Sequence, residues 1–416
     1  MDRCDTKAIV DWLADGARAA AAPQQVLLEL ADRLVESGVP LWRVAVFVRT
    51  LHPHIMGRRF LWRQGSGVTV SEAPHEMLQT AEYRDSPVAQ VTATGLALRR
   101  RLADPGCADD FAMLAELRGE GVTDYLISPL IFTDGAVHAV TWTTRQPGGF
   151  TDAQVAGIDS VVAPLARVAE VRALRRTASN LLDTYVGHQA GERILSGHIR
   201  RGDSETIAAA IWLSDMRGFT ALADRLPPQD LIDLLNRYFD CQTPAIVEHG
   251  GEVLKFMGDG LLAIFPIAGT ETDVGAVCRR ALDAARAARA MVAGLDGVPG
   301  VNGQRFGLAL HIGEVLYGNI GGGNRLDFTC IGPAVNLAAR IEKLAGRLGR
   351  TVLTSGGFAR HCAGALAAVG QFVLPGFSDA QDVYGLPDES GCPPGVTDDA
   401  AREPGAGLNS LGGKGA

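Results

Sequence analysis

The sequence predicts an α+β protein in which two folded domains are joined by a helical connector and followed by a polar tail. Residues 206–386 alternate strand-like and helix-like runs in the order β-α-β-β-α-β. Residues 1–150 combine a helical run with several strand-like runs, and residues 151–205 begin with one long helical pattern. The β-α-β-β-α-β order predicts a ferredoxin-like antiparallel sheet with helices on one face, plus additions.

Length and composition limit the classes of function. The 416 residues can hold two or three domains, and 47% hydrophobic with 21% charged residues is typical of a folded globular protein. The net charge is -8, and no basic run with interleaved aromatic residues is present, so we expect no nucleic-acid partner.

The sequence also bears on location and redox state. The first 22 residues mix charges with apolar residues and lack the apolar core of a signal peptide, and no run suffices to span a bilayer. We therefore expect a cytoplasmic protein. The seven cysteines are scattered without a C-x-x-C pair, which favours reduced thiols over a disulfide frame or a zinc site.

The first domain, residues 1–150, has a helical run at 24–38 and strand-like runs at 41–51, 57–65, 124–132 and 136–144. This order, with the phrases TLHP, SPVAQV and GGFTDAQ, resembles the GAF-like sensor domains that precede bacterial cyclases. A small-molecule sensor and a dimerisation platform both fit. The spacing of Cys107, His52, His54 and His75 matches no strong metal site.

The connector, residues 151–205, opens with an apolar stripe at mostly three- and four-residue steps: Ile158, Val161, Leu165, Val168, Val171, Leu174, Ala178, Leu181 and Tyr185. Such a stripe can pair with its own copy in a dimer. The first half can equally pack on its own domain. The second half has few neighbours to bury it, so we predict a dimeric connector there.

The second domain, residues 206–386, is predicted as strand 207–215, helix 228–250, two strands around a Gly-Asp-Gly turn, helix 274–294, strands 306–321 and 325–332, and helix 334–346. Residues 387–416 are rich in Gly, Pro and Asp and poor in large apolar residues. That composition predicts a disordered tail.

Two aspartates stand out in this domain. Asp215 ends the apolar run AAAIWLSD, and Asp259 occupies the Gly-Asp-Gly turn of EVLKFMGDGLLAIF. A carboxylate at a strand end and one at a hairpin tip can converge, where one or two hard cations would bind them together with substrate phosphates. The pattern indicates phosphoryl transfer.

Four segments share one resemblance: SDMRGFTALAD, EHGGEVLKFMGDGLLAIFP, GLALHIGEVLYGNIGG and DFTCIGPAVNLAARIEKLA. Together they resemble the catalytic domain of class III nucleotidyl cyclases, the adenylate and guanylate cyclase family. The resemblance covers most of residues 206–386. It implies that Asp215, Asp259 and the carbonyl of Met216 bind two Mg²⁺ or Mn²⁺ ions per site.

The resemblance also assigns phosphate contacts. The backbone amides of Arg217, Gly218 and Phe219 open the next helix, where unpaired N–H groups favour phosphate. Arg350, in GRTVLTS, stands where the family has a triphosphate-binding lysine. The charge is kept there, although the geometry of arginine differs.

Lys255 and Thr329 match the family positions that contact the purine. A lysine donor and a threonine acceptor suit adenine, whereas guanylate cyclases of this family resemble the pattern with Glu and Cys at these places. The cysteine of this chain, Cys330, comes one residue late. Asn336, seven residues after Thr329, fixes that register.

Asn336 and Arg340 are four residues apart and share one face of a helix. The resemblance implies that the asparagine positions the ribose and the arginine stabilises charge on the α-phosphate. In the family, metal ligands from one subunit face the purine, Asn and Arg residues of the other. We therefore expect a homodimer with two composite sites.

These assignments predict an adenylate cyclase that converts ATP to 3′,5′-cyclic AMP and pyrophosphate under the control of its N-terminal domain. A guanylate cyclase and a catalytically silent nucleotide-binding module remain alternatives. A diguanylate cyclase is disfavoured, because Val253 stands where the second acid of its GGEVL string would be. No P-loop motif of a Walker-type ATPase occurs.

Overall fold

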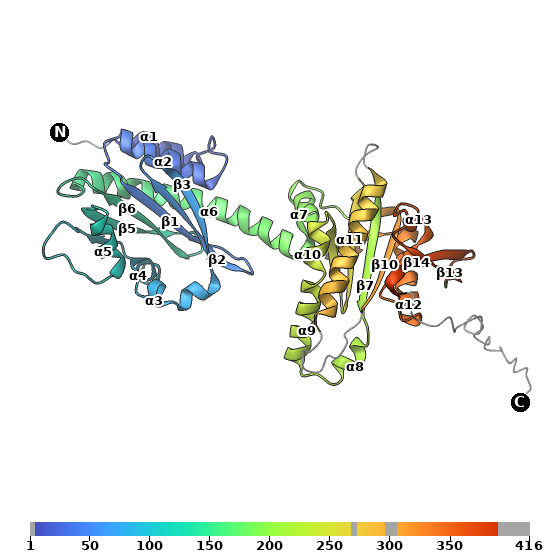
Figure 1. Cartoon of the computed structure of the whole chain (residues 1–416). Coiled ribbons are helices and arrows are strands. Elements are labelled where there is room, and N and C mark those ends of the chain that lie inside the picture. The colour runs from blue at the N-terminus through green and yellow to red at the C-terminus, as the bar shows by residue number, and fades with distance from the viewer. Residues whose placement is uncertain (1–4, 268–272, 296–305, 324, 390–416) are drawn as a thin grey trace, which may run out of the picture. The chain divides into compact units, whose positions relative to one another are not determined.

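The structure is a computed structural model that describes residues 5–267, 273–295, 306–323 and 325–389 (Figure 1). The chain forms two compact units, Met1–Tyr185 and Val186–Ala416. Of the tail predicted at 387–416, only the short 3₁₀ turn Pro387–Glu389 is described, and the rest lies outside the described residues. Within the described residues, no helix combines the length and apolar character needed to cross a membrane.

Unit 1 is built on a six-stranded antiparallel sheet in the order β3-β2-β1-β6-β5-β4. Its strands are β1 (Arg43–Arg49), β2 (Ile55–Arg63), β3 (Gly67–Pro74), β4 (Leu98–Arg100), β5 (Asp124–Ile131) and β6 (Val137–Thr144). The four strands expected from the sequence are present. Strands β3 and β4 were not expected from the sequence, because β3 is largely exposed and β4 is only three residues long.

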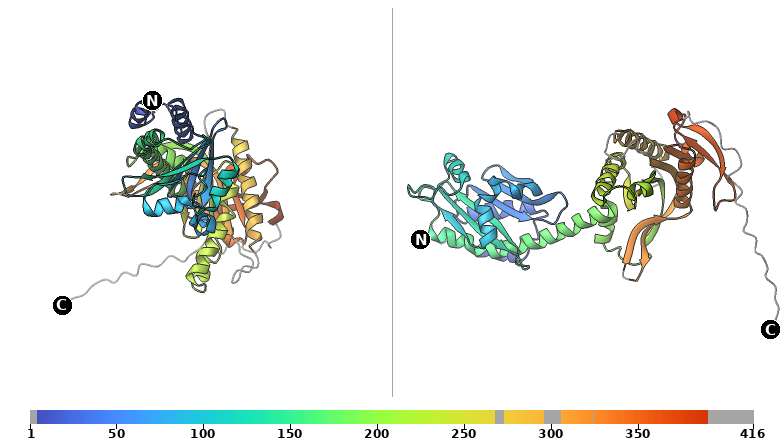
Figure 2. Two further views of the ribbon diagram at one scale, coloured as in Figure 1. Left: turned by 90° about the vertical axis from the view of Figure 1, so that its left-hand side faces the viewer. Right: turned by 90° about the horizontal axis from the view of Figure 1, so that it is seen from below.

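Helices cover both faces of this sheet (Figure 2). On one face, helices α1 (Lys7–Ala14), α2 (Pro23–Glu36) and α6 (Asp152–Val186) bury a core that includes Leu30, Val44, Trp62, Trp142 and Ile158. On the other face, α4 (Pro87–Thr94) and α5 (Ala112–Gly119) bury a second core that includes Val91, Leu114, Tyr125 and Ile127. The turns η1 (His75–Gln79) and α3 (Ala81–Arg84) connect β3 to α4.

Helix α6 changes character along its length. Ile158, Val161, Leu165 and Val168 are buried in the core of unit 1. Val171, Leu174 and Tyr185 are 67%, 62% and 79% exposed, and this part of α6 extends past the sheet (Figure 1). The first half of the predicted stripe therefore packs on its own domain, and the second half is mostly exposed among the described residues of unit 1.

Unit 2 begins with α7 (His188–Leu195) and β7 (Ser204–Met216). There follow the helices α8 (Phe219–Ala223), α9 (Pro228–Asp240) and α10 (Thr243–Glu248), the hairpin β8 (Glu252–Met257) and β9 (Gly260–Ile267), α11 (Val274–Ala293), β10 (Phe306–Gly322), β11 (Arg325–Ile331) and α12 (Pro333–Arg347). The last elements are β12 (Val352–Ser355), α13 (Gly356–Ala359), β13 (Ala367–Val373) and β14 (Ala380–Gly385). The α+β class is confirmed. The helix predicted over 228–250 is two helices, with Pro244 in the first turn of the second.

The sheet of unit 2 has eight strands in the order β13-β14-β12-β10-β7-β9-β8, and β11 pairs with β10. The strands β10, β7, β9 and β8 are antiparallel neighbours, whereas β10 and β12 are parallel. The sheet is thus larger than a four-stranded ferredoxin-like core. The ferredoxin-like assignment itself stays a prediction.

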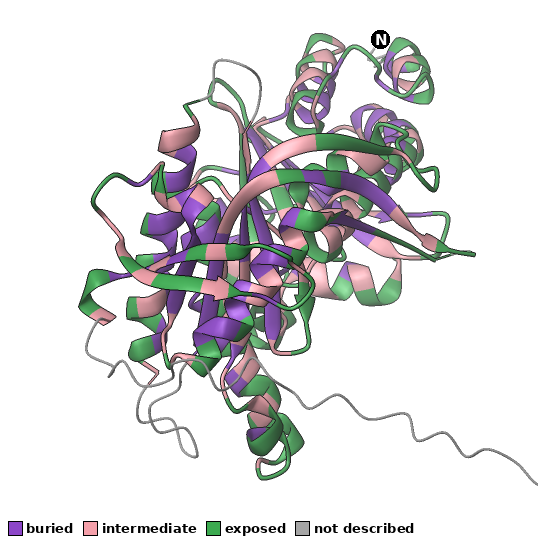
Figure 3. Ribbon diagram, turned by 90° about the vertical axis from the view of Figure 1, so that its right-hand side faces the viewer, coloured by how far each residue is buried: buried purple, intermediate pink, exposed green. Residues whose placement is uncertain are grey.

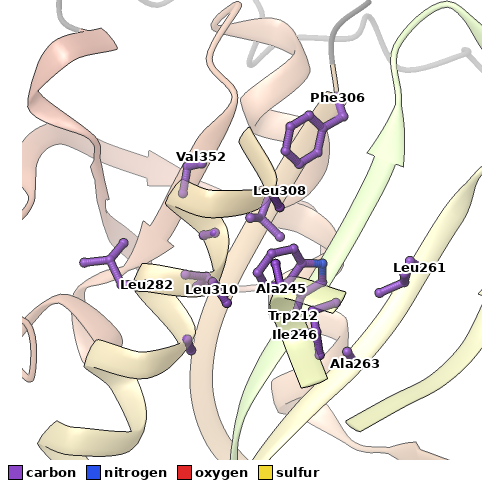
Figure 4. Packing of buried hydrophobic residues seen from close by; sticks show 14 of the residues in the cluster. Trp212, Ala245, Ile246, Leu261, Ala263, Leu282, Phe306, Leu308, Leu310 and Val352 are labelled. Carbon is purple, nitrogen blue, oxygen red and sulfur yellow. The ribbon is translucent and has the colours of Figure 1, made fainter. Parts of the chain in front are cut away.

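Helices lie on both faces of this sheet, so the expectation of helices on one face is wrong. Trp212, Leu308 and Leu310 point to the face covered by α10 and α11, where Ala245, Ile246 and Leu282 pack (Figure 4). Ala309 points the other way and packs against Ile341 and Ala345 of α12. The central strands are consequently buried, as their continuous apolar sequences require (Figure 3).

Candidate active site

Asp215 and Asp259 are brought together by strand pairing. Asp215 is next to the last residue of β7 and lies opposite Gly260, the first residue of β9. The backbone N–H of Met216 donates to the carbonyl oxygen of Asp259 at 3.3 Å. Gly258, at φ +66°, supplies the left-handed turn that returns the chain into β9. The predicted convergence at a strand end and a hairpin tip is present.

The pKa of Asp215 is shifted by its surroundings. Burial is the largest cause that raises the pKa of Asp215 to about 7, and the negative charge of Asp259 and a hydrogen bond to it contribute to that rise. Glu342 on α12 adds repulsion, which Arg217 opposes. A site with several acids close together favours a bound cation, because the cation relieves their repulsion.

The donor set fits Mg²⁺ or Mn²⁺. Two carboxylates and a backbone carbonyl at Met216 are oxygen ligands of the kind these hard cations take. The described residues contain no cluster of three or more His, Cys, Asp or Glu side chains suited to a metal. Asp215 and Asp259 would therefore hold the ions with substrate phosphates and water completing the coordination.

An ion pair that was not expected from the sequence lies beside the aspartates. Arg217 Nη1 lies 2.7 Å from Glu342 Oε1, and Arg217 Nη2 donates to the Glu342 carbonyl oxygen at 3.1 Å. The Glu342 side chain is only 5% exposed, and burial raises the pKa of its carboxyl group although Arg217 acts in the opposite direction. The pair ties the loop after Asp215 to α12. The only sequence signal for the buried Glu342 is its place in the helical segment RIEKLA.

Glycines make room for this ion pair. A Cβ atom at Gly307, which pairs with Asp215, would overlap the Arg217 guanidinium. A Cβ atom at Gly346 of α12 would lie 2.9 Å from Arg217 Nη1. The guanidinium thus passes between β10 and α12 at the two positions where each has a glycine.

The predicted phosphate-binding segment has a shorter helix than expected. Gly218 is the N-cap of α8 at φ +73°, and α8 has only five residues, from Phe219. So short a helix has little dipole, and any phosphate contact would depend on the individual N–H groups of residues 217–219. The Arg217 side chain is engaged with Glu342.

Lys255 and Thr329 come from separate strands that the structure brings near each other. Lys255 Nζ of β8 lies 2.8 Å from Asp327 Oδ2 of β11. Thr329 is two residues further along β11, so it shares a face with Asp327. The Thr329 hydroxyl is buried and has no hydrogen-bond partner among the described residues. An unpaired buried hydroxyl is costly, which makes it a natural ligand contact.

Cys330 occupies the opposite face of β11. Its side chain is 2% exposed and packs with Tyr317 and Phe328 in an apolar cluster. Burial raises the pKa of its thiol to about 11. Cys330 therefore cannot take the place of Thr329 without a one-residue shift of the strand, which would move every side chain of β11 to the other face.

Asn336 and Arg340 lie on the first half of α12, and neither side chain has a hydrogen bond or ion pair within the described part of the chain. At 3.6 residues per turn, Arg340 is about 160° and Asn336 about 120° around the helix axis from Glu342. Glu342 faces Arg217, beside Asp215. The pair Asn336 and Arg340 consequently points away from the aspartates of its own chain.

Arg350 lies in the loop between α12 and β12. Its Nη1 is buried without a partner among the described residues, and a Cβ atom at Gly385 of β14 would be 3.0 Å from it. The adjacent Thr351 accepts a hydrogen bond from the N–H of Leu308, one residue past Gly307. Arg350 thus lies beyond the same strand ends as Asp215, packed toward β14, and its phosphate role stays a prediction.

Comparison with known proteins places these residues in a family. Residues 203–356 match the model of the adenylate and guanylate cyclase catalytic domain. The chain is 33% identical over 166 residues to an adenylate cyclase of Anabaena cylindrica, covering 39% of this chain and 32% of the relative. It is 29% identical over 197 residues to adenylate cyclase 1 of Rhizobium meliloti, covering 46% and 29%. The chain thus spans about a third of these relatives.

Solved cyclases are similar to the same part of the chain. A bacterial light-regulated adenylyl cyclase is 29% identical at a TM-score of 0.38, covering 44% of this chain and 92% of that one. The guanylyl cyclase Cya2 is 27% identical at a TM-score of 0.36, covering 45% and 98%. From the family match and the sequence relatives, residues 203–356 form a catalytic domain of the class III nucleotidyl cyclase family.

Proposed function

We propose that this protein is an adenylate cyclase that forms 3′,5′-cyclic AMP and pyrophosphate from ATP. The convergence of Asp215 and Asp259 at one end of the central strands, inside a domain of the cyclase family, carries the proposal. The enzyme uses Mg²⁺ or Mn²⁺, two ions per site, and acts as a homodimer. A GAF-like N-terminal domain regulates it in the cytoplasm.

In the reaction, the ribose 3′-oxygen forms a bond to the α-phosphorus while the bond from that phosphorus to the departing pyrophosphate breaks. The 3′-hydroxyl proton passes to water. Bound cations would lower the pKa of that hydroxyl and neutralise charge on the triphosphate. Asn336 holds the ribose, and Arg340 donates to the α-phosphate as its negative charge develops. Backbone N–H groups of residues 217–219, together with Arg350, bind phosphate oxygens.

Adenine rather than guanine is favoured by the polar groups around β11. The Lys255 ammonium can donate to a ring nitrogen, and the free Thr329 hydroxyl can accept from the exocyclic amine. Guanine presents these donors and acceptors in reverse. The named relatives above are adenylate cyclases, which agrees with this preference.

A site shared between two chains is supported by the geometry of α12. Asn336 and Arg340 have no intrachain partners among the described residues and face away from Asp215. A single chain therefore cannot bring Asp215 and the pair Asn336 and Arg340 to the same nucleotide. A two-fold dimer would place the metal-binding half of one protomer against the Asn336 half of its partner, twice.

The purine assignment is tested by comparing ATP and GTP turnover. Hydrogen-bond readout of a buried edge can discriminate by about 10⁴-fold. We expect ATP to be converted far better, and Lys255→Glu with Thr329→Cys to erode that preference while the melting temperature is kept. Cys330→Ser is the matched control, because it alters the opposite face of β11. Comparable turnover of ATP and GTP by the wild type would reject the adenylate assignment.

A further inference from the structure

Unit 1 contains a cavity of about 820 Å³ between its sheet and helices α2 and α6. Its floor is aliphatic and aromatic, and includes Val46 and Val48 of β1, Phe60 of β2, and Leu165 and Val168 of α6. The volume lies within the range of small-molecule sites, which are mostly apolar with a few polar groups. All residues that line it come from unit 1.

Charged residues at this cavity are mostly basic: Arg58, Arg172, Arg175, Arg176 and Glu72. Arg58 is neutralised by Glu72 at 2.7 Å, and Arg172 donates to the carbonyl oxygen of Ala20 at 2.6 Å. Arg175 and Arg176 are exposed and have no ion pair or hydrogen bond of their side chains within the described residues. Two uncompensated guanidinium groups thus stand beside an apolar cavity, in a chain whose net charge is -8.

We propose that this cavity binds an amphipathic anion, a free long-chain carboxylate. The alkyl chain would lie on the apolar floor, where burial of each methylene is favourable. The carboxylate would accept hydrogen bonds from Arg175 and Arg176, since the guanidinium fork matches a planar carboxylate. A second copy of this chain is the rival occupant.

The position of the cavity on α6 gives the ligand a route to influence the enzyme. Arg172, Arg175, Arg176 and Ser179 line the cavity from one face of α6, at steps of three, one and three residues. Leu174 and Tyr185 belong to the exposed apolar stripe on the opposite face of the helix. Helix α6 ends at Val186, where unit 2 begins. A ligand seated here contacts the connecting helix directly, and any effect on turnover rests on the proposed cyclase function.

Binding is tested with the whole 416-residue chain, without nucleotide, by titrating dodecanoate and its uncharged analogue dodecanol in a calorimeter. We expect one dodecanoate per chain. Arg175→Ala with Arg176→Ala should weaken dodecanoate at least about tenfold and leave dodecanol unchanged, because a hydrogen bond to a charged group carries about that much affinity. Ala173→Trp should abolish binding of both by filling the cavity. Arg101→Ala is the control, an exposed arginine elsewhere on unit 1.

Several outcomes would overturn the proposal. Absence of saturable binding to the folded wild type would do so, as would binding that the double arginine variant leaves intact. If Ala173→Trp instead changes self-association in sedimentation while no dodecanoate binds, a second copy covers the cavity. Competition by inorganic phosphate alone would identify an anion site without a tail. Because these readouts need no turnover, they stand apart from a failure of the cyclase assignment.

Discussion

Gly307 illustrates how a single residue constrains the proposed site. It lies on β10 opposite Asp215, and any Cβ atom there would overlap the Arg217 guanidinium. The Glu342 side chain of the Arg217–Glu342 ion pair is only 5% exposed, so displacing the guanidinium would break an ion pair of a buried carboxylate. Side chains far apart in sequence thereby decide which residue β10 tolerates.

Gly307→Ala should therefore destabilise unit 2 by about 1–3 kcal/mol, the usual cost of overpacking or of an unpaired buried group. The measurement is urea denaturation followed by circular dichroism. Gly322→Ala on the same strand is the matched control, because its Cβ atom would meet nothing within 4 Å. Equal stability of the two variants would mean that Arg217 moves aside without cost.

His311 on β10 should make the stability of unit 2 depend on pH. Its Nδ1 lies 2.7 Å from Ser355 Oγ, and burial lowers the pKa of the imidazole to about 4. A lowered pKa means that the folded state prefers the neutral ring. Above the unfolded pKa of about 6.5 the ring is neutral in both states, and the protein has its full stability. As the pH falls from there toward 4, the unfolded state takes up a proton that the folded state refuses, and the free energy of unfolding falls.

His311→Gln should remove this pH dependence, which amounts to about 3 kcal/mol at most. The free energy of unfolding is compared between the wild type and the variant at pH 7 and pH 4.5, because carboxyl groups titrate in both proteins and cancel in the difference. His198→Gln, an exposed histidine of the same unit, is the control. A difference between wild type and His311→Gln that does not change with pH would contradict the cause assigned here.

At the scale of elements, the sequence predicted most strands and helices where their periodicity was continuous. β10 and α12 are long, regular patterns, and both were expected close to their observed bounds. The helix expected over 228–250 is broken at residues 241–242, because Pro244 cannot donate a backbone hydrogen bond to the preceding turn and is tolerated only in the first turn of a new helix. Strand β3 was missed because an exposed edge strand has little apolar alternation to detect.

The candidate site shows the same division between local and long-range information. Asp215 and Asp259 could be proposed as partners because each ends a recognisable local pattern. The Arg217–Glu342 ion pair joins residues 125 apart in sequence, and the Lys255–Asp327 pair joins residues 72 apart. Such pairings depend on how α12 and β11 pack, which no periodicity encodes. The helix α12 on the second face of the sheet was unforeseen for that reason.

The exposed part of α6 is the candidate dimer contact. Leu174 and Tyr185 are 62% and 79% exposed, and Leu181 belongs to the same stripe. Leu174→Ser with Leu181→Ser should weaken a dimer by about 1.5–3 kcal/mol for each leucine that the partner buries. Sedimentation velocity over a concentration series measures the effect.

Val373→Ser on β13 is the control for the helix, since Val373 is 70% exposed but lies in unit 2, far along the chain. Cyclase activity of the α6 variant should become more dependent on protein concentration than that of the control. A dimer constant that α6 substitutions leave unchanged would place the dimer contact elsewhere in the chain.

At the scale of the whole molecule, the proposed enzyme needs two copies of the chain for each site. Each protomer supplies Asp215 to one site and Asn336 to the other under this proposal, which follows from the opposed faces of α12. Each protomer would thus contribute one half to each of two sites. That arrangement can be separated from a single-chain site by complementation.

Asp215→Ala should abolish activity by removing a metal ligand, and Asn336→Ala should impair it by releasing the ribose, so each homodimer should be nearly inactive. Random mixing makes about half of the dimers mixed, and each mixed dimer has one intact site and one site with both lesions. Activity should recover to about one quarter of the wild type, provided the subunits exchange. Differently tagged protomers, captured in tandem, establish that mixed dimers form. If such dimers remain inactive, both residues serve the same chain's site and the composite arrangement is wrong. The cyclase chemistry itself is tested separately, by ATP turnover of the wild type.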